Sequence, residues 1–213
     1  MKTIERLSAI LLLCGLTACG VAGQVQSGRQ ALLVNKHEEA LGRFQAAVVS
    51  DPNYVMRSGP FREGIWTYVG RAQYSVGKFT EARRSLGRAV SLDNEDYLAR
   101  IYLGLTLARS GDRSGGLHEI RIGMKGIYDW LEYLTSTAQY GRYWDPSRDI
   151  RSQIEKDLAM ISGAEFDWQK LIADAEWLGK KTEEEVDMAR RDEQRQYRDR
   201  LGPGSGVSIG VGF

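Results

Sequence analysis

The chain has 213 residues, with 29 lysines and arginines against 28 aspartates and glutamates, so its formal net charge is +1 with neutral histidines. This balance lacks the basic excess expected of a nucleic-acid-binding protein, and no nucleic-acid partner is predicted. The length is sufficient for one domain or a small repeat array.

The first nineteen residues have the layout of an export signal. Lys2 and Arg6 give a positive start, residues 7–13 are mostly apolar, and small residues follow. The apolar run is too short to span a bilayer, so it predicts a secretory signal that ends in a small-residue cleavage region. The tetrapeptide Leu-Thr-Ala-Cys at residues 16–19 resembles the lipobox of bacterial lipoproteins.

This resemblance implies that residues 1–18 are a lipoprotein signal peptide and that Cys19 becomes an acylated N-terminus, which anchors the protein in the cell envelope. Gly20 is not the aspartate that retains enterobacterial lipoproteins in the inner membrane, so the outer membrane, facing the periplasm, is the expected location. The alternative is an ordinary signal cleaved nearby, with Cys19 incidental. Cleavage before Cys19 removes Cys14, so no pair of thiols remains and we expect a fold without disulfides. The mature chain would then have 27 basic and 27 acidic residues.

An internal repeat occupies the next part of the chain. Residues 63–96 and 97–130 align without a gap at a period of 34, and Gly70 of the first pairs with Gly104 of the second. An earlier copy covers residues 21–54. A period of this length is typical of helical-hairpin repeats, whose neighbours must stack to bury a common core.

Each copy has a residue suited to a tight turn between two helices. Gly77 and Gly111 occupy this place in the later copies and can adopt the left-handed conformation that ends a helix. Asn35, which tolerates the same conformation, occupies it in the first copy. The first two copies are offset by 42 residues, so about eight extra residues within 51–62 are expected to form a loop.

The second copy resembles the tetratricopeptide (TPR) repeat. The matching consensus positions are Trp66, Val69, Gly70, Gly77, Phe79, Ala82, Leu86 and Ala89. The resemblance implies three TPR-like repeats within residues 19–130, with Ala82 at the close approach of two helices. The expected fold class is therefore all-α: a TPR-type solenoid of helical hairpins, followed by additional capping and extension helices and a flexible Gly-rich tail.

Residues 131–181 are expected to form the capping helices. Asp145 and Pro146 give a plausible helix start, and Gly163 a stop. After Gly163, an apolar stripe at helical spacing predicts a second capping helix that stops at Gly179. Its members are Trp168, Leu171, Ile172, Ala175 and Leu178.

The last two segments are polar. Thr182 and Glu185 fit a capping box that would start a third helix over residues 182–201. Because this helix is almost wholly charged, we expect a solvated extension. Residues 202–213 are rich in glycine and form the predicted flexible tail.

Aromatic side chains are unusually dense between residues 128 and 144. They are Tyr128, Trp130, Tyr133, Tyr140, Tyr143 and Trp144. Such a cluster either seals the last repeat against a capping helix or forms a ligand surface; packing is the favoured interpretation because a solenoid end must be covered.

The concave face of the repeats is the candidate partner-binding site. By the TPR resemblance, the first helix of each copy would present arginine and tyrosine there, the residue types enriched at binding hot spots. These residues are Arg29, Tyr68, Arg71, Tyr74, Tyr102 and Arg109. The alternatives are a merely solvated face, or one filled by the chain's own C-terminal helices.

No catalytic or metal motif is visible. His37 and His118 are the two histidines and lie in different copies, so neither a metal site nor a cofactor is predicted. Glycine-rich residues 202–206 lack the Gly-Lys-Ser/Thr ending of a phosphate loop. The chain is therefore not expected to be an enzyme.

The predicted function is that of an envelope adaptor, anchored in the membrane by its N-terminal lipid, that binds a protein or peptide segment in the repeat groove. Lipoproteins of this architecture often assist secretion, pilus or outer-membrane assembly, and no residue selects among these systems. One alternative is a structural element that docks through its C-terminal helices and tail. Another is an envelope enzyme with paired carboxylates. The oligomeric state is left open.

Overall fold

The computed structural model describes residues 20–58, 61–138 and 141–201; the predicted signal peptide, Cys19 and the Gly-rich tail lie outside these residues. The described part of the chain is mostly helical, with eight α-helices and one small two-stranded sheet. The helical class agrees with the prediction, and the sheet was not predicted.

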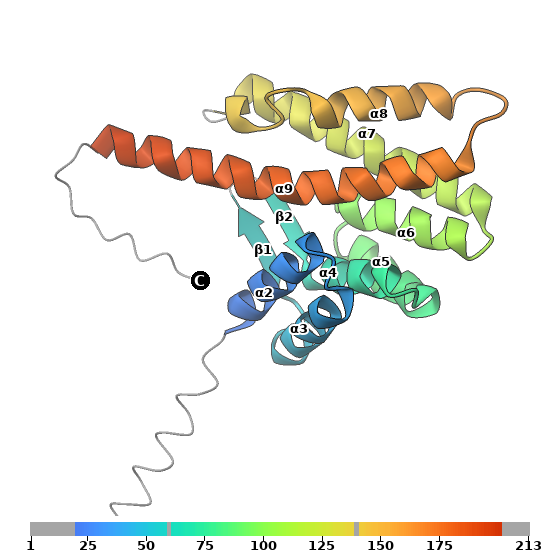
Figure 1. Ribbon diagram of the computed structural model, residues 1–213, viewed down its shortest axis with the longest axis horizontal. Helices are drawn as coiled ribbons and strands as arrows, with labels where there is room; N and C mark the ends of the chain where they lie inside the picture. The colour runs from blue at the N-terminus through green and yellow to red at the C-terminus, as the bar shows by residue number, and fades with distance from the viewer. Residues whose placement is uncertain (1–19, 59–60, 139–140, 202–213) are drawn as a thin grey trace, which may run out of the picture.

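Three consecutive helical hairpins build the first two thirds of the fold (Figure 1). Their helices are α2 (Val21–Leu33) with α3 (His37–Ser50), α4 (Ile65–Ser75) with α5 (Phe79–Leu92), and α6 (Tyr97–Arg109) with α7 (Arg113–Thr137). The three turn residues predicted from the repeat, Asn35, Gly77 and Gly111, all have positive φ, at 60°, 76° and 95°. The turn chemistry therefore ends the first helix of each hairpin as expected.

Small residues lie where the paired helices approach most closely. A Cβ atom on Gly70 would stand 2.4 Å from Cγ of Leu86, so a larger residue cannot fit between α4 and α5 without moving them. Ala82 is fully buried, which agrees with its predicted role in packing.

The insertion between the first two hairpins is not a plain loop. It forms an antiparallel β-hairpin of β1 (Val55–Ser58) and β2 (Phe61–Gly64), in which Met56 pairs with Glu63. Alternate residues face inward, as the two-residue period of a strand requires, so that Phe61 and Glu63 are buried. The insertion thus contributes a carboxyl group to the interior.

The region after the repeats differs from the prediction at two boundaries. Helix α7 continues to Thr137, and α8 (Asp149–Met160) begins after Pro146 rather than at it. Asp145 is buried and accepts hydrogen bonds from the backbone N–H groups of Ile150 and Arg151, at 3.0 and 3.1 Å. Its carboxylate therefore satisfies the first turn of α8 from outside the helix.

The last element is one continuous 34-residue helix, α9 (Trp168–Leu201). The predicted stop at Gly179 and the predicted capping box at Thr182 are both wrong, because Thr182 donates a hydrogen bond to the Leu178 carbonyl within the helix. A Cβ on Gly179 would lie 2.5 Å from the Tyr102 hydroxyl oxygen. The glycine allows α9 to cross α6 closely and does not end a helix.

Helix α9 runs between the α7–α8 pair and the first two hairpins (Figure 1). Buried side chains lie along its whole central part, namely Leu171, Ala175, Leu178, Val186 and Ala189. The charged segment that we predicted as a solvated extension is therefore part of the core as far as Ala189. Beyond it, residues 194–199 are mostly exposed.

Candidate binding groove on the helical hairpins

The six predicted groove residues come together along one face of α9. Arg29 projects from α2; Tyr68, Arg71 and Tyr74 project from α4; and Tyr102 and Arg109 project from α6. Four of them are ion-paired or hydrogen-bonded to carboxylates of α9, and Tyr68 and Tyr102 pack against the guanidinium group of Arg71.

Glu183 of α9 is held by arginines from two different hairpins. Arg29 donates from Nε and Nη2 to one carboxylate oxygen of Glu183, at 2.9 and 2.7 Å. Arg71 donates from Nη1 to the other oxygen at 2.5 Å. Asp187, one turn further along α9, accepts from Nη2 of Arg29 at 3.0 Å. These charge-assisted bonds fix the register of α9 in the groove.

The β-hairpin completes this cluster. Glu63 accepts from the same Nη1 atom of Arg71, at 2.6 Å, and its side chain is fully buried. Arg71 therefore lies between a carboxyl group of the insertion and a carboxylate of the last helix. Arg29, Arg71, Glu63, Glu183 and Asp187 are hereafter called the buried ion cluster.

The two glutamates of the cluster have opposite pKa shifts. Burial raises the pKa of Glu63 well above its usual value; Arg71 opposes this effect, and Glu183 adds to it. Burial also acts against the charge of Glu183, but Arg71 and Arg29 outweigh it and lower its pKa to about 2. Burial therefore favours the protonated form of Glu63, whereas the two arginines keep Glu183 ionised. Two arginine cations then face two carboxylates of α9.

Aromatic rings surround the cluster. The guanidinium carbon of Arg71 lies 5.0 Å from the ring centre of Tyr102 and 5.9 Å from that of Tyr68. Tyr74 packs edge-on against Tyr102 and donates from its hydroxyl to Glu176 of α9 at 2.5 Å. Burial and Glu176 raise the pKa of Tyr74, so its hydroxyl stays protonated as this donor.

A pocket of about 580 Å³ opens beside α9 where the groove is not filled. Four of the six predicted residues line it: Arg71, Tyr74, Tyr102 and Arg109. The other walls include Leu32 and Leu33 at the end of α2, together with Trp177 and Lys180 of α9. Trp177 is 42% exposed, so the pocket offers a large aromatic surface at its edge.

Neither protein-family models nor curated proteins give a match to this chain.

Among the described residues there is no group of three or more histidines, cysteines, aspartates and glutamates placed to hold a metal ion. The helices described here also include none that is long and apolar enough to cross a membrane.

The outcome for the predicted site is therefore divided. Arg29 and Tyr68 are 1% and 0% exposed beneath α9, so these two predicted residues are not accessible to a partner in this structure. The alternative of a face filled by the chain's own C-terminal helix is what the contacts show. The other four predicted residues line the part that remains open.

The sequence reasoning missed Glu63 and Glu183. A signal for Glu183 exists: it lies four residues after Gly179 and three before Val186, so it falls on the buried face if the helix continues through the glycine. Glu63 had a weaker signal, because it alternates with the apolar Phe61 in the short insertion.

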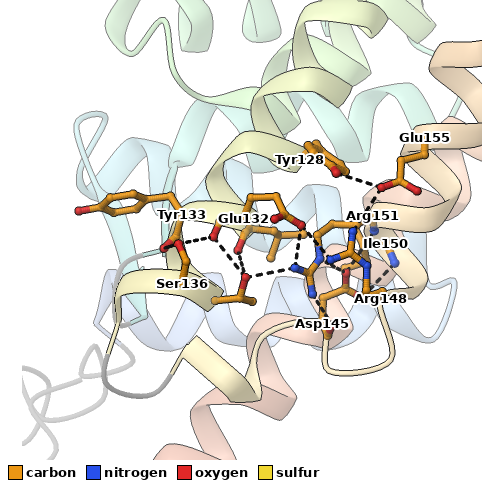
Figure 2. A network of polar contacts seen from close by, with 11 residues as sticks. Tyr128, Glu132, Tyr133, Ser136, Asp145, Arg148, Ile150, Arg151 and Glu155 are labelled. Carbon is orange, nitrogen blue, oxygen red and sulfur yellow. Dashed lines mark hydrogen bonds and ion pairs between the residues drawn. The ribbon is translucent and has the colours of Figure 1, made fainter.

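A second polar network joins α7 to the start of α8 (Figure 2). Arg151 donates to Asp145 at 2.9 Å and to Glu132 of α7 at 3.0 Å, while the backbone N–H of Asp145 donates to Glu185 of α9 at 2.7 Å. This network joins α7, α8 and α9, and we assign it a structural role.

The aromatic cluster divides in the same region. Trp130 and Trp144 pack edge-on with ring centres 5.2 Å apart, and Trp144 is buried. Tyr133 is mostly exposed, and Tyr128 donates to Glu155 (Figure 2). Tyr140 lies outside the described residues. The two tryptophans agree with the predicted packing role, and Tyr133 does not.

Proposed function

We propose that this protein is a lipid-anchored adaptor of the bacterial envelope, built from tetratricopeptide-type repeats, which binds a segment of a partner protein in the pocket beside α9. The three hairpins support the repeat assignment. Their turns have matching positive φ, and consensus residues such as Gly70 and Leu86 make the closest contacts between paired helices.

The observation that carries the proposal is the composition of the pocket. Tyr74, Arg109 and Trp177 belong to the residue types that dominate binding energy at protein interfaces. Leu32 and Leu33 add apolar surface, and Lys180 adds charge. A pocket of about 580 Å³ can accommodate a few side chains of an extended or helical segment.

The proposed anchor would keep this pocket close to the membrane. Helix α2 begins two residues after Cys19, and the pocket lies at the far end of α2. A helix of 13 residues is about 20 Å long, at roughly 1.5 Å per residue. A partner would thus be held within a short distance of the lipid surface.

Site-specific photocrosslinking in native membranes tests the binding site. A photoreactive amino acid at position 177 should capture a discrete partner, whereas the same amino acid at Val49, which is 87% exposed on α3, should not. Identical capture from both positions, or none from position 177, would contradict the proposed site.

The anchor is tested separately by Cys19→Ser. This substitution removes the proposed acylation site, so the variant should leave the membrane fraction or accumulate unprocessed. If it still sediments with membranes after a high-salt wash, the anchor is not the cysteine lipid.

A second candidate function is supported by the end of α9. Residues 194–199 are mostly exposed, and Tyr197 is 45% exposed, so this end could dock on another component. Deleting residues 194–213 separates the two functions, because the buried ion cluster and the pocket remain intact. Loss of the partner captured at position 177 would favour the docking function.

A further inference from the structure

We infer that the inner groove across the first two hairpins is a binding surface for an acidic amphipathic helix, and that the half of α9 after Gly179 is its resident occupant, displaced when a partner brings a helix of the same charge pattern. This inference rests on the proposed function, since it names the chemistry of the partner and its route into the groove.

Charge complementarity supports this choice of partner. The hairpins contribute Arg29 and Arg71, both buried, while the occupying helix contributes Glu183 and Asp187, four residues apart on one face. Glu63, on the hairpin side of the groove, also accepts from Arg71, but burial raises its pKa and so weakens its contribution to this balance. Any helix that fills the groove must therefore bring two carboxylates, because an unpaired buried arginine is strongly unfavourable.

The close crossing at Gly179 limits the segment that can be displaced. Helix α9 passes so close to Tyr102 of α6 that a Cβ at position 179 would lie 2.5 Å from the hydroxyl oxygen. The apolar half of α9 up to this crossing stays in place, so the competing helix replaces only the segment that follows. The pattern that fits is Glu-x-x-x-Asp, as at Glu183 and Asp187.

The C-terminal half of α9 is held by contacts that another helix can replace. Its buried apolar side chains after Gly179 are the small Val186 and Ala189, and its buried Glu185 accepts one hydrogen bond from the backbone of Asp145, which a carboxylate at the same place in another helix can also accept. The desolvation of buried ion pairs largely offsets their attraction, so the cluster specifies the occupant more than it stabilises it. A partner helix with the same groups would satisfy the arginines equally well, and it must overcome the high effective concentration of the tethered α9.

The test uses the full chain and a fluorescently labelled peptide that corresponds to its residues 181–192, the part of α9 that follows the crossing at Gly179. The receptor variant is Glu183→Gln with Asp187→Asn. These substitutions remove the two carboxylates of α9 that pair with the arginines and leave the groove residues of the hairpins unchanged. The peptide should bind this variant roughly tenfold or more tightly than the wild type, because the competent groove is more populated. Fluorescence anisotropy measures both affinities.

Two controls identify the contacts. Glu184→Gln changes a neighbouring half-buried carboxylate that makes no ion pair among the described residues, and it should bind the peptide as the wild type does. A peptide with glutamine and asparagine at the positions of Glu183 and Asp187 should not bind. Adding Arg71→Gln to the receptor variant should abolish binding of the acidic peptide.

A second measurement does not depend on the folding of any variant. Saturating acidic peptide should raise the hydrogen-exchange rate of residues 181–192 in the wild-type chain and leave that of α4 and α5 unchanged. No increase at saturation, or equal binding of the neutral peptide, would overturn the inference. Exchange of α9 between two copies, detected as a dimer that does not bind the peptide, would also overturn it. Photocrosslinking from position 177, which tests the proposed function, gives a result that does not depend on these peptide measurements.

Discussion

The two halves of α9 are buried by different means. Before Gly179, the helix is held through Leu171, Ala175 and Leu178, which are fully buried. After Gly179, buried carboxylates also hold it: that of Glu183 is bound by two buried arginines from α2 and α4, and that of Glu185 accepts from the backbone N–H of Asp145. One helix thus combines an apolar segment that any packed core could hold with a charged segment that fits one specific surface.

This difference shows why a highly charged helix need not be solvated. The partner of Glu183 on α2 is 154 residues away in the chain, so no local pattern shows that the charge is satisfied. Apolar burial is nonspecific and depends on area, whereas a buried charge needs its partner at hydrogen-bond distance. The following changes test this contrast.

Removing the central cation should have the largest effect. Arg71→Met leaves Glu63 and Glu183 without the guanidinium they share, and losing one member of a buried ion cluster typically costs about 3–5 kcal/mol in the free energy of unfolding. Chemical denaturation measures this loss. Arg83→Met, an exposed arginine on α5, is the matched control and should change stability by less than about 0.5 kcal/mol. Equal stability of the two variants would contradict the importance of the cluster.

Truncation in the apolar half should be next in size. Leu178 is fully buried, and Leu178→Ala should lower the free energy of unfolding by about 2–5 kcal/mol through lost transfer energy and the cavity left behind. The ion cluster should survive, so hydrogen exchange at residues 181–192 should change less than in Arg71→Met. A larger change in hydrogen exchange at residues 181–192 in Leu178→Ala than in Arg71→Met would show that the two halves of α9 are not held separately.

The close crossing at Gly179 should respond to added volume. Gly179→Leu places atoms where the Tyr102 hydroxyl now lies and should cost about 1–3 kcal/mol by overpacking. Gly42→Leu is the matched control, because no atom of another element lies within 4 Å of a Cβ at this helical glycine. It should stabilise the protein by up to about 1 kcal/mol through helix propensity. If both substitutions change the free energy of unfolding in the same direction, the close crossing of α9 and α6 at Gly179 is contradicted.

A pH dependence of stability is expected where α8 contacts the first half of α9. Burial and the adjacent Asp174 carboxyl raise the pKa of Asp157 to about 7, from a usual value of 3.8. The folded protein then holds this proton more tightly than the unfolded chain, so stability falls as the pH rises from about 4 to 7. Asp157→Asn should flatten this fall in denaturation curves recorded across the range. An unchanged slope would remove Asp157 as its source.

Sequence patterns with local causes predicted much of this fold. The turns at Asn35, Gly77 and Gly111 depend on the backbone freedom of single residues, and the close contact of Gly70 depends on side-chain size. Backbone freedom and side-chain size are properties of the single residue and can be read from the sequence without knowledge of tertiary contacts. The assignment of six arginines and tyrosines to one face of the hairpins came from the resemblance to TPR repeats.

The errors arose where a residue has two possible uses. Gly179 can end a helix or allow a close crossing, and only the position of Tyr102 decides between them. The insertion was too short for its alternation to stand out, so Glu63 was not recognised as buried. Glu183 was assigned to a solvated face because its arginines lie on distant hairpins. All three depend on tertiary contacts.

The most direct test of the occupied groove is a double-mutant cycle between Arg29 and Glu183, measured as free energies of unfolding of the full chain. The single variants are Arg29→Met and Glu183→Gln, and the double variant combines them. Residues in contact within one ion network couple by about 0.5–3 kcal/mol, and we predict a value in this range. A coupling energy of zero, within the roughly 0.3–0.5 kcal/mol seen for independent sites, would contradict the placement of α9 in the groove.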